Sequence, residues 1–187
     1  MRKALLVPAL LAALVSFGIG SAASADQRDP SLPTLFQFLK SAQHSDQASL
    51  VEDKIWEIWS ATGDAKLDQL MTSSSNAMES GDYWTAIGDI DQILKAKPDF
   101  AEGWNKRATI YFLMGDYQKA IADIDRTLEL EPRHFGALSG LGMSNLKLGR
   151  DAAAADAFRR LLSIDPLYPN AKRNLKMAQD ALAKNSI

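Results

Sequence analysis

The stretch AEGWNKRATIYFLMGDYQKAIADIDRTLELEPRH, residues 101–134, carries landmarks that recur along the chain at one fixed spacing. A proline, a glycine, an alanine and a large apolar residue each reappear after 34 residues. Self-similarity at such a period indicates stacked repeats, and it predicts three units, 67–100, 101–134 and 135–168. The columns are Pro98, Pro132 and Pro166; Gly81, Gly115 and Gly149; Ala86, Ala120 and Ala154; and Ile90, Ile124 and Phe158.

Each unit has the pattern of two helices. In the second unit, apolar residues from Trp104 to Phe112 recur at the three-and-four spacing of an amphipathic helix. Gly115 then provides the left-handed residue that ends this helix, and Asp116 is suited to cap the next one. Pro132 ends the second helix. The sequence therefore predicts an all-α chain of helical hairpins.

These residues give the chain a family resemblance. The middle unit resembles a tetratricopeptide repeat (TPR), the third matches through Gly142, Gly149, Ala154, Phe158 and Pro166, and the first helix of the first unit is degenerate. The resemblance implies a solenoid of paired helices whose concave groove is lined by the first helix of each pair. In the middle unit the family's signature positions hold Trp104, Ala108, Tyr111, Gly115, Tyr117, Ala120 and Pro132.

Segments on both sides of the array are predicted to cover its ends, because stacked repeats expose apolar faces there. Residues 169–187 contain one amphipathic helix and form a C-terminal cap with a tail. Residues 26–64 contain two shorter amphipathic stretches, which we interpret as a helical hairpin that covers the first unit. With this hairpin the chain resembles exported tetratricopeptide proteins of alphaproteobacteria.

The first 25 residues have the order of parts of a secretory signal peptide. Arg2 and Lys3 precede an apolar run, and Ala23-Ser24-Ala25 fits a cleavage site. Cleavage after Ala25 predicts a periplasmic or secreted protein. An uncleaved membrane anchor is the alternative, although the apolar run, Ala4 to Gly20, is shorter than the roughly 20 residues of a membrane span.

The composition excludes several classes of function. Without the signal segment the chain has 19 basic and 23 acidic residues, so it lacks the charge of a nucleic-acid-binding protein. It has no cysteine and only two histidines, His44 and His134. We therefore expect no disulfide, no metal and no cofactor, and a fold that is stabilised by packing alone.

The paired acids in the motif A-I-x-D-I-D, at 86–91 and 120–125, invite a catalytic interpretation. Residues two apart on a helix point about 200° away from each other, so Asp123 and Asp125 cannot share a metal or a substrate. We predict that both are solvated flanks of a packing stripe and that Asp123 pairs with Arg126 on the same helix.

No other residues form a catalytic pattern. His44 precedes a helix in a polar turn, and His134 follows a helix-ending proline, where a basic residue suits the carbonyl end of the helix dipole. The serines at 73–75 lie on a helix and lack the context of a nucleophile elbow. The sequence predicts a protein that is not an enzyme.

The family's concave positions define the predicted binding groove. Domains of this family that clasp a carboxylate use Lys, Asn and Arg there, and here only Asn105, Lys106 and Arg173 remain. The methionines favour apolar side chains of a polypeptide partner instead. The predicted groove residues are Met71, Ser75, Met78, Asn105, Lys106, Thr109, Phe112, Ser139, Met143, Leu146, Arg173 and Met177.

The sequence thus predicts a non-catalytic scaffold in the bacterial envelope that binds a segment of another protein in its groove. Two alternatives stay open. The chain is a self-associating structural component, or the N-terminal hairpin already occupies the groove and the groove residues are core.

Overall fold

The structure is a computed structural model that describes residues 26–184. The predicted signal segment, 1–25, and the last three residues lie outside the described part of the chain. Residues 26–184 form nine helices and no strand. None of these helices is both long and apolar enough to cross a membrane.

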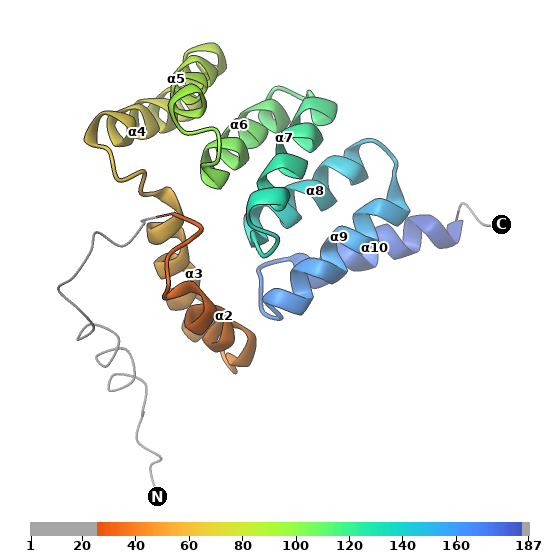
Figure 1. The fold of residues 1–187 in the computed structure, drawn as a ribbon. Helices are drawn as coiled ribbons and strands as arrows, with labels where there is room; N and C mark the ends of the chain where they lie inside the picture. The colour runs from red at the N-terminus through yellow and green to blue at the C-terminus, as the bar shows by residue number, and fades with distance from the viewer. Residues whose placement is uncertain (1–25, 185–187) are drawn as a thin grey trace, which may run out of the picture.

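Three helix pairs and a final helix follow one another in a row, and the N-terminal helices lie to one side of it (Figure 1). Each helix of the row packs against the next. This arrangement confirms the predicted all-α, helical-hairpin solenoid. The pairs are α4 (Ala65–Glu79) with α5 (Tyr83–Ala96), α6 (Ala101–Leu113) with α7 (Tyr117–Leu130), and α8 (Phe135–Lys147) with α9 (Asp151–Ile164), followed by α10 (Ala171–Lys184).

The turn inside each pair has the chemistry that the sequence predicts. Gly115 has φ +80°, a left-handed conformation that glycine adopts without strain. The Asp116 carboxylate accepts a hydrogen bond from the Lys119 backbone N–H at 3.2 Å and so caps α7. Between the two helices of the middle pair, Ala108 and Ala120 are almost fully buried. Small side chains at this contact let the two helices approach closely.

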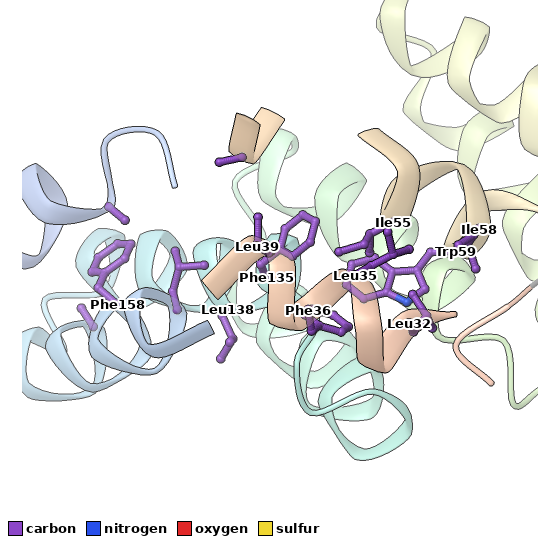
Figure 2. Packing of buried hydrophobic residues seen from close by; sticks show 14 of the residues in the cluster. Leu32, Leu35, Phe36, Leu39, Ile55, Ile58, Trp59, Phe135, Leu138 and Phe158 are labelled. Atoms are coloured by element: carbon purple, nitrogen blue, oxygen red, sulfur yellow. The ribbon is translucent and has the colours of Figure 1, made fainter. Parts of the chain in front are cut away.

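The N-terminal hairpin consists of α2 (Leu32–Ser41) and α3 (Ser45–Ser60). Its apolar side chains share one core with the third pair and α10, whereas the first pair has a separate core. Figure 2 shows hairpin residues Leu35, Ile55 and Trp59 in one cluster with Phe135 and Leu138 of α8. The expectation that the hairpin covers the first unit is therefore wrong.

Aromatic contacts explain this placement. The Trp59 indole is fully buried, and it stacks on the His134 ring with 4.1 Å between ring centroids. Its centroid lies 5.0 Å from that of Phe135, which begins α8. Nearer the chain start, the Arg28 guanidinium binds the Asp99 carboxylate at 2.9 Å. The N-terminal segment thus follows the loops that join successive pairs.

One acid of the A-I-x-D-I-D motif, Asp123, differs from the prediction, whereas Asp125 is exposed as predicted. Asp123 is 6% exposed, and its carboxylate forms two hydrogen bonds with the Arg107 guanidinium, at 2.7 and 2.8 Å. Arg107 also binds Asp91 at 2.6 Å, whereas Arg126 binds Glu129. The solvated assignment of Asp123 is wrong because its partner lies on the neighbouring helix α6. One guanidinium ties α5, α6 and α7 together.

Replacing Arg107 tests this link. We expect Arg107→Gln to lower the free energy of unfolding by about 2 kcal/mol, because it leaves the buried Asp123 carboxylate without its charged donor. The matched control is Arg126→Gln, whose partner Glu129 is exposed and whose loss is worth less than about 0.5 kcal/mol. Urea unfolding followed by circular dichroism measures both, and equal effects would contradict the assignment.

Candidate functional site

A cavity of about 160 Å³ opens between α6 and α8, the first helices of the second and third pairs. Five of the predicted groove residues line it: Asn105, Thr109, Phe112, Ser139 and Met143. The remaining lining residues are Ala108, Ile124, Gly136 and Gly140. Most of the wall is apolar, so the cavity suits an apolar group.

Two glycines of α8 lie in the wall of this hollow. Gly136 and Gly140 are one helical turn apart and therefore face the same side. A Cβ atom at Gly140 would lie 3.3 Å from the Ile124 side chain. Glycine inside a helix costs about 1 kcal/mol of stability relative to alanine. Two glycines one turn apart in a helical pattern therefore indicate a packing or functional role that the sequence could have revealed. The sequence-based prediction missed both residues.

A second hollow, of about 420 Å³, lies between the end of α3, α4 and α6. It contains the predicted residues Met71, Ser75 and Lys106, and the Lys106 ammonium lies 3.3 Å from the Ser75 hydroxyl. Its other lining residues include the acids Glu57 and Asp68. The predicted groove is thus divided into an apolar hollow and a polar one.

A buried polar group lies beside the apolar cavity. The Asn105 amide donates to the Glu102 carboxylate at 2.9 Å, and the His134 Nε2 atom is 3.1 Å from the same oxygen. The Ala137 backbone N–H donates to His134 Nδ1 at 3.1 Å, which places the imidazole proton on Nε2. His134 therefore caps α8 and is fully buried. Its predicted role at the end of α7 is wrong.

The comparisons with known proteins agree on one family. A family model described as tetratricopeptide repeat matches residues 73–126 and 105–169. A TPR repeat-containing protein of Rhizobium etli is 37% identical over 154 residues, which cover 82% of this chain and 76% of that protein. The chain belongs to the tetratricopeptide repeat family.

Solved tetratricopeptide structures share the fold. The first TPR domain of Spaghetti (RPAP3), bound to the HSP90 peptide SRMEEVD, is similar with a TM-score of 0.62 and 23% identity, covering 64% of this chain and 96% of that one. The TPR2B domain of yeast Sti1, in complex with pHsp70, has a TM-score of 0.58 and 17% identity, covering 65% and 99%. At these identities the likeness concerns the fold.

A tetratricopeptide carboxylate clamp is not assembled here. The Asn105 amide is used by Glu102, inside the protein. Lys106 belongs to the second hollow, and Arg173 is exposed on α10. The three polar residues left from the clamp pattern therefore do not converge on one point.

The hairpin covers one end of the groove without closing it. A Cβ atom at Gly136, which lines the apolar cavity, would lie 2.6 Å from the Trp56 ring. Trp56 therefore packs directly on the backbone at the start of α8. The cavity stays open beyond this contact, so the alternative in which the hairpin occupies the whole groove does not describe this structure.

The other predicted groove residues are spread out. Met78 packs against the core of the first pair, and Leu146 packs against the core that includes the hairpin. Met177 on α10 is 54% exposed. The structure brings none of these three into either hollow, although the Asn174 amide of α10 reaches the Met143 sulfur at 3.5 Å.

The hydroxyl and acidic side chains of the array have structural roles. Ser74 donates to the Ala86 carbonyl at 3.0 Å, and Ser75 donates to the Met71 carbonyl at the same distance. Within residues 26–184, no cluster of three or more His, Asp or Glu side chains could hold a metal ion.

The contact between Trp56 and Gly136 generates a stability prediction. Gly136→Ala places a methyl group in the space of the Trp56 ring, and overpacking of this kind costs about 1–3 kcal/mol. The control Gly88→Ala meets nothing within 4 Å in α5 and should raise the free energy of unfolding by up to about 1 kcal/mol. Urea unfolding followed by tryptophan fluorescence compares them. A Gly136→Ala protein as stable as the control would contradict the contact.

Proposed function

We propose that this chain is a non-catalytic protein-interaction module that holds a segment of another polypeptide in the cavity between α6 and α8. The observation that carries the proposal is the glycine-lined, largely apolar hollow on the first helices of the array. Proteins of the same fold, Spaghetti (RPAP3) and yeast Sti1, have been solved with an HSP90 peptide and with pHsp70. These complexes support the choice of a polypeptide ligand.

The size of the cavity specifies what enters it. An apolar protein cavity of about 150 Å³ accepts a benzene molecule, so a cavity of about 160 Å³ suits one leucine- or phenylalanine-sized side chain. Met143 and Phe112 supply adaptable apolar walls. The ligand in this proposal is a segment anchored by a single large apolar side chain.

Filling the cavity tests the proposal. We expect Gly140→Leu to weaken binding of a peptide selected from a phage-displayed random library at least about tenfold, since burial of one such side chain contributes about 1.5–3 kcal/mol. The matched control, Gly88→Leu, introduces the same side chain into α5, where a Cβ atom meets nothing within 4 Å. Fluorescence anisotropy with the selected peptide measures both affinities.

Two results would contradict the proposal: the library yields no binding peptide, or Gly140→Leu binds as tightly as Gly88→Leu. Circular dichroism of both variants checks that they are folded. Light scattering on the wild-type protein at high concentration addresses the alternative of a self-associating component. A monomer under those conditions removes that alternative.

The proposed location is the periplasm or the extracellular space, after removal of residues 1–25. This part of the proposal is supported by the basic start, the apolar run and Ala23-Ser24-Ala25. The side chain of Asp26, the residue that would follow the cut, is buried and binds Arg28.

Export gives a direct prediction. Expressed from its full sequence in a Gram-negative host, the protein should appear in the periplasmic fraction with an N-terminus at Asp26. Intact-mass measurement of that fraction checks the cut, and Ala25→Arg serves as the variant that blocks processing. A full-length protein retained in the cytoplasm would contradict the proposal.

A further inference from the structure

Two carboxyl groups meet where the hairpin touches the end of the array. Glu52 belongs to α3, and Asp165 follows α9 in the loop before α10. The Asp165 side chain is fully buried, and its Oδ1 atom accepts a hydrogen bond from the Leu167 backbone N–H at 3.0 Å. Its Oδ2 atom is buried without a hydrogen-bond donor. A buried carboxylate oxygen of this kind is costly unless a proton or a donor reaches it.

The Glu52 carboxyl group interacts with the Asp165 carboxyl group, so a proton on Glu52 is available to act as a donor there. Burial and the negative charge of Asp165, with a contribution from Asp53, raise the pKa of Glu52 to about 7. Burial also raises the pKa of Asp165. A protonated Glu52 donates to Asp165, whereas two ionised carboxylates would repel each other across the contact. The charged groups that act on Glu52, Asp165 and Asp53, are both acidic.

The other titratable groups near Glu52 and Asp165 are neutral or are paired with other residues. The phenol of Tyr168 lies beside both acids and hydrogen-bonds with Ser139, and burial raises its pKa, which keeps it neutral. Arg133 is held by Glu131 at 2.8 Å and lies over the Phe36 ring. His134, on which Trp59 stacks, is paired with Glu102.

The contact between the hairpin and the array lies beside the apolar cavity. Glu52 and Trp56 are one helical turn apart on α3 and therefore face the same side. Trp56 packs on Gly136 at the cavity wall, and Trp59 stacks on His134, two residues before Gly136. Movement of the hairpin away from the array would widen that end of the groove and uncover Phe135.

We propose that one proton shared between Glu52 and Asp165 holds the N-terminal hairpin over the end of the groove, so that the hairpin is a pH-sensitive cover. Loss of the proton places two buried negative charges in contact and loosens the hairpin. The effect on ligand access rests on the proposed function of the groove. The effect on the hairpin is independent of that proposed function.

The direction of the pH dependence follows from the raised carboxyl pKa. The undocked Glu52 titrates near its ordinary value of 4.5, and the docked one near 7. Docking is therefore strongest below about pH 4.5 and weakens as the pH rises through 7. Between these values one proton is bound on docking, so the docking equilibrium constant falls by up to about tenfold per pH unit.

Amide hydrogen exchange of the whole protein, followed by mass spectrometry, tests the cover. Between about pH 5.5 and pH 7.5, after correction for intrinsic exchange, we expect protection of α2 and α3 to fall by up to about tenfold per pH unit. Protection of α4 and α5, which have their own core, should stay constant. Glu52→Gln mimics the protonated acid and should make hairpin protection independent of pH.

Asp46→Asn is the matched control, because Asp46 is an exposed acid in the first turn of the same helix, and it should keep the wild-type pH dependence. Asp165→Asn is a second variant that should abolish it, in case Glu52→Gln does not fold. A hairpin whose protection is flat in the wild type, or still pH-dependent in both variants, overturns the proposal. If the hairpin responds to pH but peptide affinity does not, the cover stands and the groove function fails.

Discussion

A pair of helices with one apolar face cannot bury that face by itself, and every other feature of this molecule follows from that constraint. Phe100, which precedes the first helix of the second pair, is almost completely buried in the core of the first pair. Each pair depends on the next for its core. The chain ends this dependence with α10, whose outward faces are charged.

The sequence was a good guide wherever a feature depends on its own repeat. Gly115 and Asp116 specify their turn through contacts within a few residues, and their roles were predicted correctly. The role of Asp123 was predicted wrongly, because the Arg107 guanidinium that binds it lies on the preceding helix. A helical pattern shows which face of a helix is apolar and not which distant surface covers it. The placement of the hairpin on His134 was therefore beyond prediction.

The candidate site shows the same division. The first helices of the pairs were identified as the lining of the groove, and five predicted residues do line one cavity. Gly136 and Gly140 also line that cavity, and family positions alone do not single them out. Asn105 occupies a family position, yet its amide is turned to Glu102. The position of a residue in a repeat thus predicts well whether it lies in the groove. It predicts poorly whether the polar atoms of its side chain are free to bind a ligand.

The long-range docking of the hairpin also bears on how the chain folds. Repeat arrays with contacts only between neighbours behave nearly as one-dimensional chains, in which parts can form or fray independently. Here Trp59 packs on His134 and Phe135, about 75 residues further along. Such a contact raises the contact order and slows folding. The N-terminal hairpin completes its packing only after the third pair has formed, because the two share one core.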